Sequence, residues 1–179
     1  MNLPNRLTVL RVCMVPVFVV FMLWNGLGSS AKYVAAVIFI LASMTDWLDG
    51  YLARKNNLVT DCGKFMDPIA DKLLVCSAMI CLVEKGALPA WIVIIIIGRE
   101  FIISGFRLVA SDKGVVIAAS YWGKFKTVSQ MLMVILLILD LGGVFNTIAQ
   151  VLIWVALVLT VVSLVDYMVK NRSVLSGDM

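Results

Sequence analysis

Apolar residues in this chain gather into six long runs, separated by short polar or glycine-containing segments. A helix needs about 20 mostly apolar residues to cross the hydrocarbon core of a bilayer, and the six runs are of that order. No repeat of fixed period and no low-complexity segment is visible. The pattern predicts six transmembrane helices, which cover residues Leu7–Trp24, Tyr33–Leu52, Asp67–Val83, Leu88–Ala110, Trp122–Leu139 and Val144–Val169.

These spans predict an all-α integral membrane protein in which six helices form one bundle and residues 1–179 form a single domain. The first apolar run carries Pro16 and follows the polar segment 2–8. We therefore expect this run to be retained and not to be cleaved as a signal peptide. The residues before Leu7 are expected to form a short segment on the membrane surface.

The composition supports a membrane protein and excludes other classes. Hydrophobic residues make up 62% of the chain and charged residues 15%, whereas a soluble domain carries about half and a quarter. A water-soluble globule, a disordered tail and a disulfide-stapled secreted module are therefore excluded. The four cysteines show no CxxC spacing, so we expect them to be small buried hydrophobic residues and not disulfide partners or zinc ligands.

Lysine and arginine lie mainly on one side of the predicted membrane. If both termini are on that side, 13 of the 15 cationic residues are there, and only Lys32 and Lys85 fall opposite. The positive-inside rule therefore predicts that both termini are cytoplasmic. The net charge of +4 fits cationic loops beside anionic lipid, so no nucleic-acid partner is expected.

Four aspartates fall where the second predicted span ends and the third begins. Asp46 and Asp49 are three residues apart, and Asp67 and Asp71 are four apart, so each pair shares one face of a helix. The two spans are antiparallel neighbours joined by a short cytoplasmic loop. We therefore expect both pairs to meet near the cytoplasmic surface, and we call these four residues the acidic motif.

Four carboxylates that converge at low dielectric repel one another, and they tolerate ionisation only with cations between them. The chain contains no histidine, and ligand sets of oxygen alone favour hard divalent ions such as Mg²⁺ or Mn²⁺. Four carboxylates can hold two such ions about 3.5–4 Å apart, which is the arrangement used for in-line displacement at phosphorus. A salt-bridged helix end is the structural alternative, but it does not require four aspartates.

Small and cationic residues accompany the acidic motif. Arg54 follows at the cytoplasmic edge, where a guanidinium suits a diphosphate. Gly50 and Gly63 lack side chains and permit close approach of a base or a ribose. Ala53 lies close to the helix face of Asp46. Together these residues favour a site for a nucleotide diphosphate.

The sequence D-x-x-D-G-x-x-A-R-x8-G-x3-D-x3-D, from Asp46 to Asp71, resembles the signature of the CDP-alcohol phosphatidyltransferase family at every fixed position. Six spans with cytoplasmic termini also fit that family over essentially the whole chain. The resemblance implies that Asp46, Asp49 and Asp67 bind metal, and that Asp71 deprotonates the acceptor hydroxyl and also contacts a metal. It further implies a homodimer and places the CDP moiety beside Gly50, Ala53, Arg54 and Gly63.

Cationic residues in the fourth and fifth spans bear on the acceptor alcohol. Arg107, Lys124 and Lys126 predict a pocket for a second phosphate, meaning a phosphorylated acceptor, and Arg99 is a further candidate for it. Two structural alternatives remain open. Glu100 can pair with Arg99 or Arg107 as a bridge, and the two lysines can be ordinary cytoplasmic charges that set topology.

Three segments together look like the bacterial phosphatidylglycerophosphate synthase branch of the family. They are the N-terminal N-L-P-N-R-L-T-x-x-R, the G-R-E-F run at 98–101 and the G-K-x-K-T run at 123–127. The resemblance implies CDP-diacylglycerol and sn-glycerol 3-phosphate as substrates, CMP as a product, and a bacterial cell-membrane enzyme whose active site faces the cytoplasm. Asn5 and Thr8 are expected near the nucleotide, or alternatively as an N-cap and turn before the first helix.

Other functions remain possible from the sequence alone. Within the family, the acceptor can be that of a cardiolipin or a phosphatidylinositol-phosphate synthase. A cation transporter is a rival from another class, because intramembrane carboxylates often mark ion paths. It predicts charges at the bilayer midplane and an internal repeat, whereas the charges here gather near one surface. A structural assembly subunit explains neither the small residues nor the surplus of aspartate.

Overall fold

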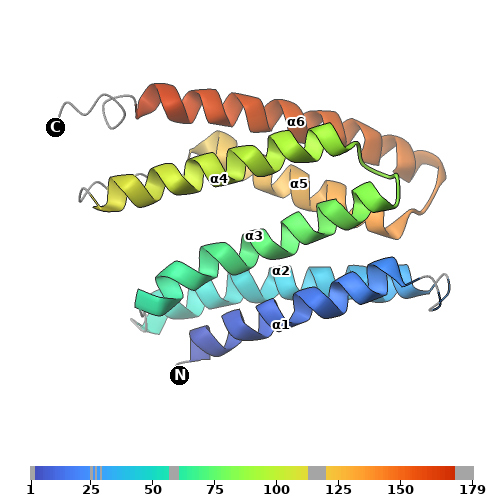
Figure 1. Cartoon of the computed structure of the whole chain (residues 1–179), viewed down its shortest axis with the longest axis horizontal. Helices are drawn as coiled ribbons and strands as arrows, with labels where there is room; N and C mark the ends of the chain where they lie inside the picture. The colour runs from blue at the N-terminus through green and yellow to red at the C-terminus, as the bar shows by residue number, and fades with distance from the viewer. Residues whose placement is uncertain are drawn as a thin grey trace. The chain divides into compact units, whose positions relative to one another are not determined.

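The structure is a computed structural model. It describes the backbone of residues 3–24, 26, 28, 30–56, 61–112 and 120–171 and the side chains of 8–24, 26, 28, 30–45, 69–70, 72–111 and 120–171. These residues form six α-helices and no strand, as the apolar pattern predicts (Figure 1). The helices are α1 (Leu3–Leu23), α2 (Ala31–Asn56), α3 (Asp61–Glu84), α4 (Ala90–Asp112), α5 (Tyr121–Leu139) and α6 (Gly143–Lys170).

Among the described residues, two helices, α5 and α6, are long and apolar enough to cross a membrane, judged by length and composition. Shorter apolar stretches cover Thr8–Leu23 in α1 and Ala31–Thr45 in α2. The all-helical class is therefore confirmed, while a bundle of six spans stays a prediction.

Three helices extend beyond the approximate apolar spans that the sequence predicts. The predicted break at 54–57 is helical through Asn56, and α3 begins at Asp61, before the predicted start at Asp67. The segment before Leu7 is the first turn of α1, where Pro4 is tolerated because the first backbone N–H groups have no partner within the helix. Hydropathy marks the apolar part of a helix, and the hydrogen-bonded helix continues past it.

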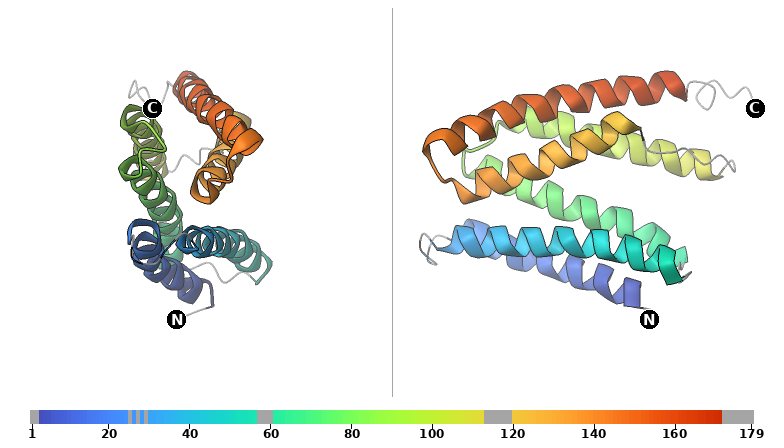
Figure 2. Two further views of the ribbon diagram at one scale, coloured as in Figure 1. Left: turned by 90° about the vertical axis from the view of Figure 1, so that its right-hand side faces the viewer. Right: turned by 180° about the vertical axis from the view of Figure 1, so that it is seen from behind.

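The chain divides into two compact units. The first contains α1, α2, α3 and the end of α5 from Val134, and the second contains α4, the start of α5 and α6. In the first unit α1 lies beside both α2 and α3 (Figure 2). In the second unit α4 packs against α6.

One face of α1 is buried along its whole described length. Phe18 on this face meets Phe39 of α2, with ring centroids 6.0 Å apart. Small residues on α2, such as Ala35 and Ala42, are fully buried and let the two helices approach closely. The buried face of α1 is spaced by three or four residues, as one helical stripe requires, and consists of Thr8, Arg11, Val15, Phe18 and Met22.

In the second unit α4 and α6 run in the same direction. Trp91 near the start of α4 meets Trp154, with ring centroids 6.1 Å apart. Near the end of α4, Phe106 meets Tyr167 edge to face at 5.9 Å. The contact nearer the end of α4 is also the contact nearer the end of α6, so the two helices are parallel. Their C-terminal ends therefore lie on the same side of this unit.

Candidate active site

The aspartates of the acidic motif lie on two helices that contact each other. Asp46 and Asp49 belong to α2, and Asp67 and Asp71 belong to α3. Both segments are helical, so the three- and four-residue spacings place each pair on one helix face. The carboxylates themselves lie outside the described side chains, and their convergence stays a prediction.

The donor set of the acidic motif fits hard divalent cations, because it offers carboxylate oxygens only. Among the side chains that the structure describes, no group of three or more His, Cys, Asp or Glu residues is arranged to hold a metal ion. The carboxylates of the acidic motif lie outside those described side chains, so the metal site predicted there stays a prediction.

The residues predicted to bind CDP also occupy helices. Gly50, Ala53 and Arg54 belong to α2, and Gly63 belongs to α3. Asn5 lies inside α1. The side chains of these residues fall outside the described part, so their contacts with a nucleotide stay predictions.

Thr8 lies on the buried face of α1, one turn before Arg11, and is 1% exposed. The alternative role for Asn5 and Thr8, an N-cap ahead of the first helix, is wrong because α1 begins at Leu3. An N-cap residue precedes the first helical residue. Thr8 is thus a polar residue inside α1, in the same N-terminal half of the helix as Arg11.

Arg99, Glu100 and Lys126 form a partly buried charge cluster in the second unit, in which Lys126 is the buried member. Glu100 Oε1 accepts a hydrogen bond from Arg99 Nη1 at 2.9 Å and another from Lys126 Nζ. The Arg99 and Lys126 side chains are 10% and 3% exposed. Arg99 Nε also donates to Ser163 Oγ at 3.1 Å. The cluster therefore ties α4 to both α5 and α6.

This cluster changes the interpretation of two predicted acceptor residues. Arg99 pairs with Glu100, which is one of the two bridges that the sequence left open. Lys126 is buried and ion-paired, which does not fit a solvated charge that only sets topology. The sequence around Lys126 does not show this burial, because the partner residue Glu100 lies 26 residues away on another helix.

Arg107 and Lys124 have different surroundings from this charge cluster. Both are exposed, and among the described residues neither forms an ion pair. The Arg107 Cζ atom lies 5.9 Å from the centre of the Tyr167 ring, and Lys124 Nζ lies 5.3 Å from that of Tyr121. Aromatic rings hold both cations without neutralising them, so their charge is available to an anionic ligand.

Tyr167 is a residue near Arg107 that sequence analysis missed. It is 3% exposed, and its hydroxyl has no hydrogen-bond partner among the described residues. A tyrosine in the last turns of an otherwise apolar helix was the available signal. Nearby, Asp166 accepts hydrogen bonds from Ser120 Oγ and pairs with Lys170, with each contact at 2.7 Å.

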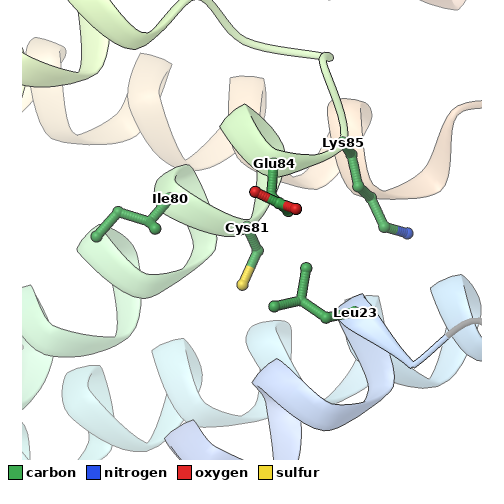
Figure 3. A pocket seen from close by; sticks show the side chains of 5 residues that line it. All are labelled: Leu23, Ile80, Cys81, Glu84 and Lys85. Atoms are coloured by element: carbon green, nitrogen blue, oxygen red, sulfur yellow. The ribbon is translucent and has the colours of Figure 1, made fainter.

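A separate cavity of about 450 Å³ lies between the far ends of α1 and α3 (Figure 3). Its lining contains none of the predicted site residues and consists of Leu23, Ile80, Cys81, Glu84 and Lys85. Cys81 is buried as expected of a small hydrophobic residue, whereas Cys13 is exposed, which corrects that expectation for this position. The cavity lies at the end of α3 opposite Asp67.

Most of the chain is similar to known phosphatidyltransferases. A model of the CDP-alcohol phosphatidyltransferase family matches residues 1–162. A CDP-diacylglycerol–glycerol-3-phosphate 3-phosphatidyltransferase of Bacillus subtilis is 50% identical over 148 residues, which cover 77% of each chain. A probable phosphatidylglycerophosphate synthase of Mycobacterium tuberculosis is 43% identical over 177 residues, covering 98% of this chain and 84% of the relative.

A third relative carries the same name as the Bacillus protein. This Haemophilus influenzae protein is 43% identical over 136 residues, which cover 73% of this chain and 72% of the relative. The match to the family model spans most of the chain, and the acidic motif lies inside it. The chain therefore belongs to the CDP-alcohol phosphatidyltransferase family.

Proposed function

We propose that this protein transfers a phosphatidyl group from CDP-diacylglycerol to sn-glycerol 3-phosphate, giving phosphatidylglycerophosphate and CMP. One observation carries the proposal: the complete acidic motif lies on two contacting helices of a chain that is 43–50% identical to relatives named for this reaction. Residues 1–179 act as one catalytic domain in phospholipid biosynthesis.

The acidic motif supplies the ligands and the base. Asp46, Asp49 and Asp67 would hold the divalent metal, and Asp71, which accepts the proton, would also be a metal ligand. The site would hold two ions of Mg²⁺ or Mn²⁺. These ions would neutralise the diphosphate and stabilise the charge that develops on the departing CMP. Arg54 binds the diphosphate from the cytoplasmic edge. The nucleotide lies against Gly50, Ala53, Gly63, Asn5 and Thr8.

The reaction is a displacement at the phosphorus that bears diacylglycerol. The acceptor hydroxyl gives its proton to Asp71, and its oxygen forms a new bond to that phosphorus. The bond from the same phosphorus to the CMP oxygen breaks, and CMP leaves. A positioned base of this kind typically contributes about 10²–10⁴-fold to the rate.

The second unit supplies the acceptor phosphate site. Arg107 and Lys124 are exposed cations held on aromatic rings, and the ammonium of Lys124 lies in the first turn of α5, where the helix dipole also favours an anion. Arg99 reaches this turn too, because a Cβ on Gly123 would lie 3.4 Å from Arg99 Nη2. Arg99 and Lys126 complete the site from the buried side.

Replacing Arg107 by Met is expected to raise the KM for glycerol 3-phosphate by about 10–100-fold, because a charge-assisted hydrogen bond to phosphate contributes about 1.5–3 kcal/mol. The KM for CDP-diacylglycerol is expected to stay within twofold. Lys170→Met is the matched control, since Lys170 is an exposed cation paired with Asp166. Equal effects of both variants on the acceptor KM would contradict a phosphate role for Arg107.

We further propose six membrane spans with both termini in the cytoplasm, in a homodimer of the bacterial cell membrane. Contacts within each unit support alternating spans. Arg11 of α1 meets Ala42 of α2 and Phe18 meets Phe39, so α1 and α2 are antiparallel. In the second unit α4 and α6 are parallel, as helices two places apart must be in an alternating chain.

The proposal is tested by CMP release from CDP-diacylglycerol by purified protein in detergent. We expect release with glycerol 3-phosphate and Mg²⁺ or Mn²⁺, its loss when EDTA removes the metal, and its return when Mn²⁺ is restored. Release that continues at an unchanged rate in EDTA would contradict the metal site at the acidic motif.

A further inference from the structure

Arg11 is a buried cation that the proposed reaction does not use. It is 1% exposed and is among the largest fully buried side chains described. From the sequence it counts as one of the charges that set topology, which are normally solvated. A guanidinium withdrawn from water is costly unless an anion and hydrogen bonds compensate it. Its burial therefore requires an explanation.

The position of the Arg11 side chain on α2 is defined. Arg11 Nε donates a hydrogen bond to the backbone oxygen of Ala42 at 3.2 Å. Asp46 follows Ala42 by four residues on the same helix, so the two share a face and lie one turn apart. A guanidinium has five N–H donors and can bind both the Ala42 carbonyl and a carboxylate one turn away.

The direction of the Arg11 side chain also places its guanidinium at the end of the unit that carries Asp46. A long side chain on a helix leans towards the helix N-terminus. Because α1 and α2 are antiparallel, the N-terminal end of α1 lies beside the C-terminal end of α2. Arg11 therefore extends along α2 towards Asp46.

The carboxylates of this unit that the structure describes lie at its opposite end. Glu84 lines the cavity beside Leu23, and Leu23 lies about 18 Å along α1 from Arg11 at 1.5 Å per residue. The backbone oxygen of Asp140 accepts a hydrogen bond from Lys32 Nζ. Lys32 lies ten residues before Ala42 on α2. The acidic residues whose helical backbone lies at the same end as Arg11 are those of the acidic motif and Asp61, which begins α3.

We infer that Arg11 is a positioning residue whose guanidinium is the fixed counter-charge of the acidic motif, with Asp46 as its nearest partner in helix register. The inference rests on the proposed metal site and adds a function for Arg11 that neither phosphate binding nor topology provides. Four carboxylates repel one another when no metal is bound. A fixed cation on α1 offsets part of this repulsion and holds the motif ready for the ions.

The test compares Arg11→Met with Phe18→Leu by thermal unfolding in detergent, with EDTA or with excess Mn²⁺. Phe18 lies on the same buried face of α1, about two turns beyond Arg11, and its contact is with Phe39. We expect Arg11→Met to lower Tm mainly in EDTA, so that Mn²⁺ raises its Tm by about twice the wild-type increment. Phe18→Leu should lower Tm equally in both conditions.

A double variant keeps the test decisive if Arg11→Met alone does not fold. Removing one partner of a buried pair is far more harmful than removing both, so Arg11→Met with Asp46→Asn should recover folding in EDTA. Arg11→Lys keeps the charge and should retain the wild-type response to Mn²⁺.

Two results separate failure of this inference from failure of the proposed function. If wild-type Tm does not respond to Mn²⁺, the metal site itself is wrong. If the wild type responds, but Arg11→Met loses Tm equally in EDTA and Mn²⁺ and adds to Asp46→Asn without coupling, Arg11 only ties α1 to the Ala42 carbonyl, and the inference is overturned.

Discussion

Replacing Asp71 by Asn is expected to slow CMP release by about 10²–10⁴-fold, the usual contribution of a positioned general base. An amide cannot take up the proton of the acceptor hydroxyl at neutral pH, but its oxygen can still contact a metal ion. Much of the Mn²⁺ and CDP binding should therefore remain. Single-turnover CMP release and separate binding measurements check the two parts of this prediction.

Asp140→Asn is the control for the Asp71 variant. Asp140 lies outside the acidic motif, in the turn after α5, with a φ of 43° that asparagine adopts readily. Its rate of CMP release should equal that of the wild type. A wild-type rate from Asp71→Asn would contradict the assignment of the base, and so would a loss of Mn²⁺ binding as complete as the loss of activity.

Replacing Glu100 by Gln is expected to destabilise the protein by about 1.5–3 kcal/mol, because it removes the negative charge that two cations share, one of them buried. Glu100 binds both Arg99 and Lys126, whose side chains are 10% and 3% exposed. The change should appear in thermal or denaturant unfolding in detergent, and it should be present with and without substrate.

The surface pair of Lys170 and Asp166 gives the matched contrast. Lys170 is 65% exposed, and solvated pairs of this kind contribute little. Lys170→Met should therefore leave the unfolding transition almost unchanged. Equal destabilisation by the Glu100 and Lys170 variants would show that the cluster of Arg99, Glu100 and Lys126 does not hold α4, α5 and α6 together.

The sequence predicted the helices well because each one is marked by its own apolar run. The acidic motif could be found for a similar reason: its spacings are short, and one helix determines them. The pattern did not predict that α2 continues to Asn56 and that α3 begins at Asp61, because hydropathy does not detect a polar helix end.

Contacts between helices could not be predicted in the same way. The burial of Arg11 depends on Ala42, which is 31 residues away, and that of Lys126 depends on Glu100, 26 residues away. The local pattern around a lysine or arginine does not show whether another helix will cover it. Both residues were therefore grouped with solvated cytoplasmic charges, although Lys126 was also considered for phosphate.

The central claim is that this protein uses glycerol 3-phosphate as the acceptor for a phosphatidyl group from CDP-diacylglycerol. The most direct measurement is CMP release by the purified protein with CDP-diacylglycerol, Mn²⁺ and one acceptor at a time. Glycerol 3-phosphate should support release, whereas phosphatidylglycerol and inositol phosphate should not. Release with either of those two but not with glycerol 3-phosphate, or no release with any acceptor, would contradict the account.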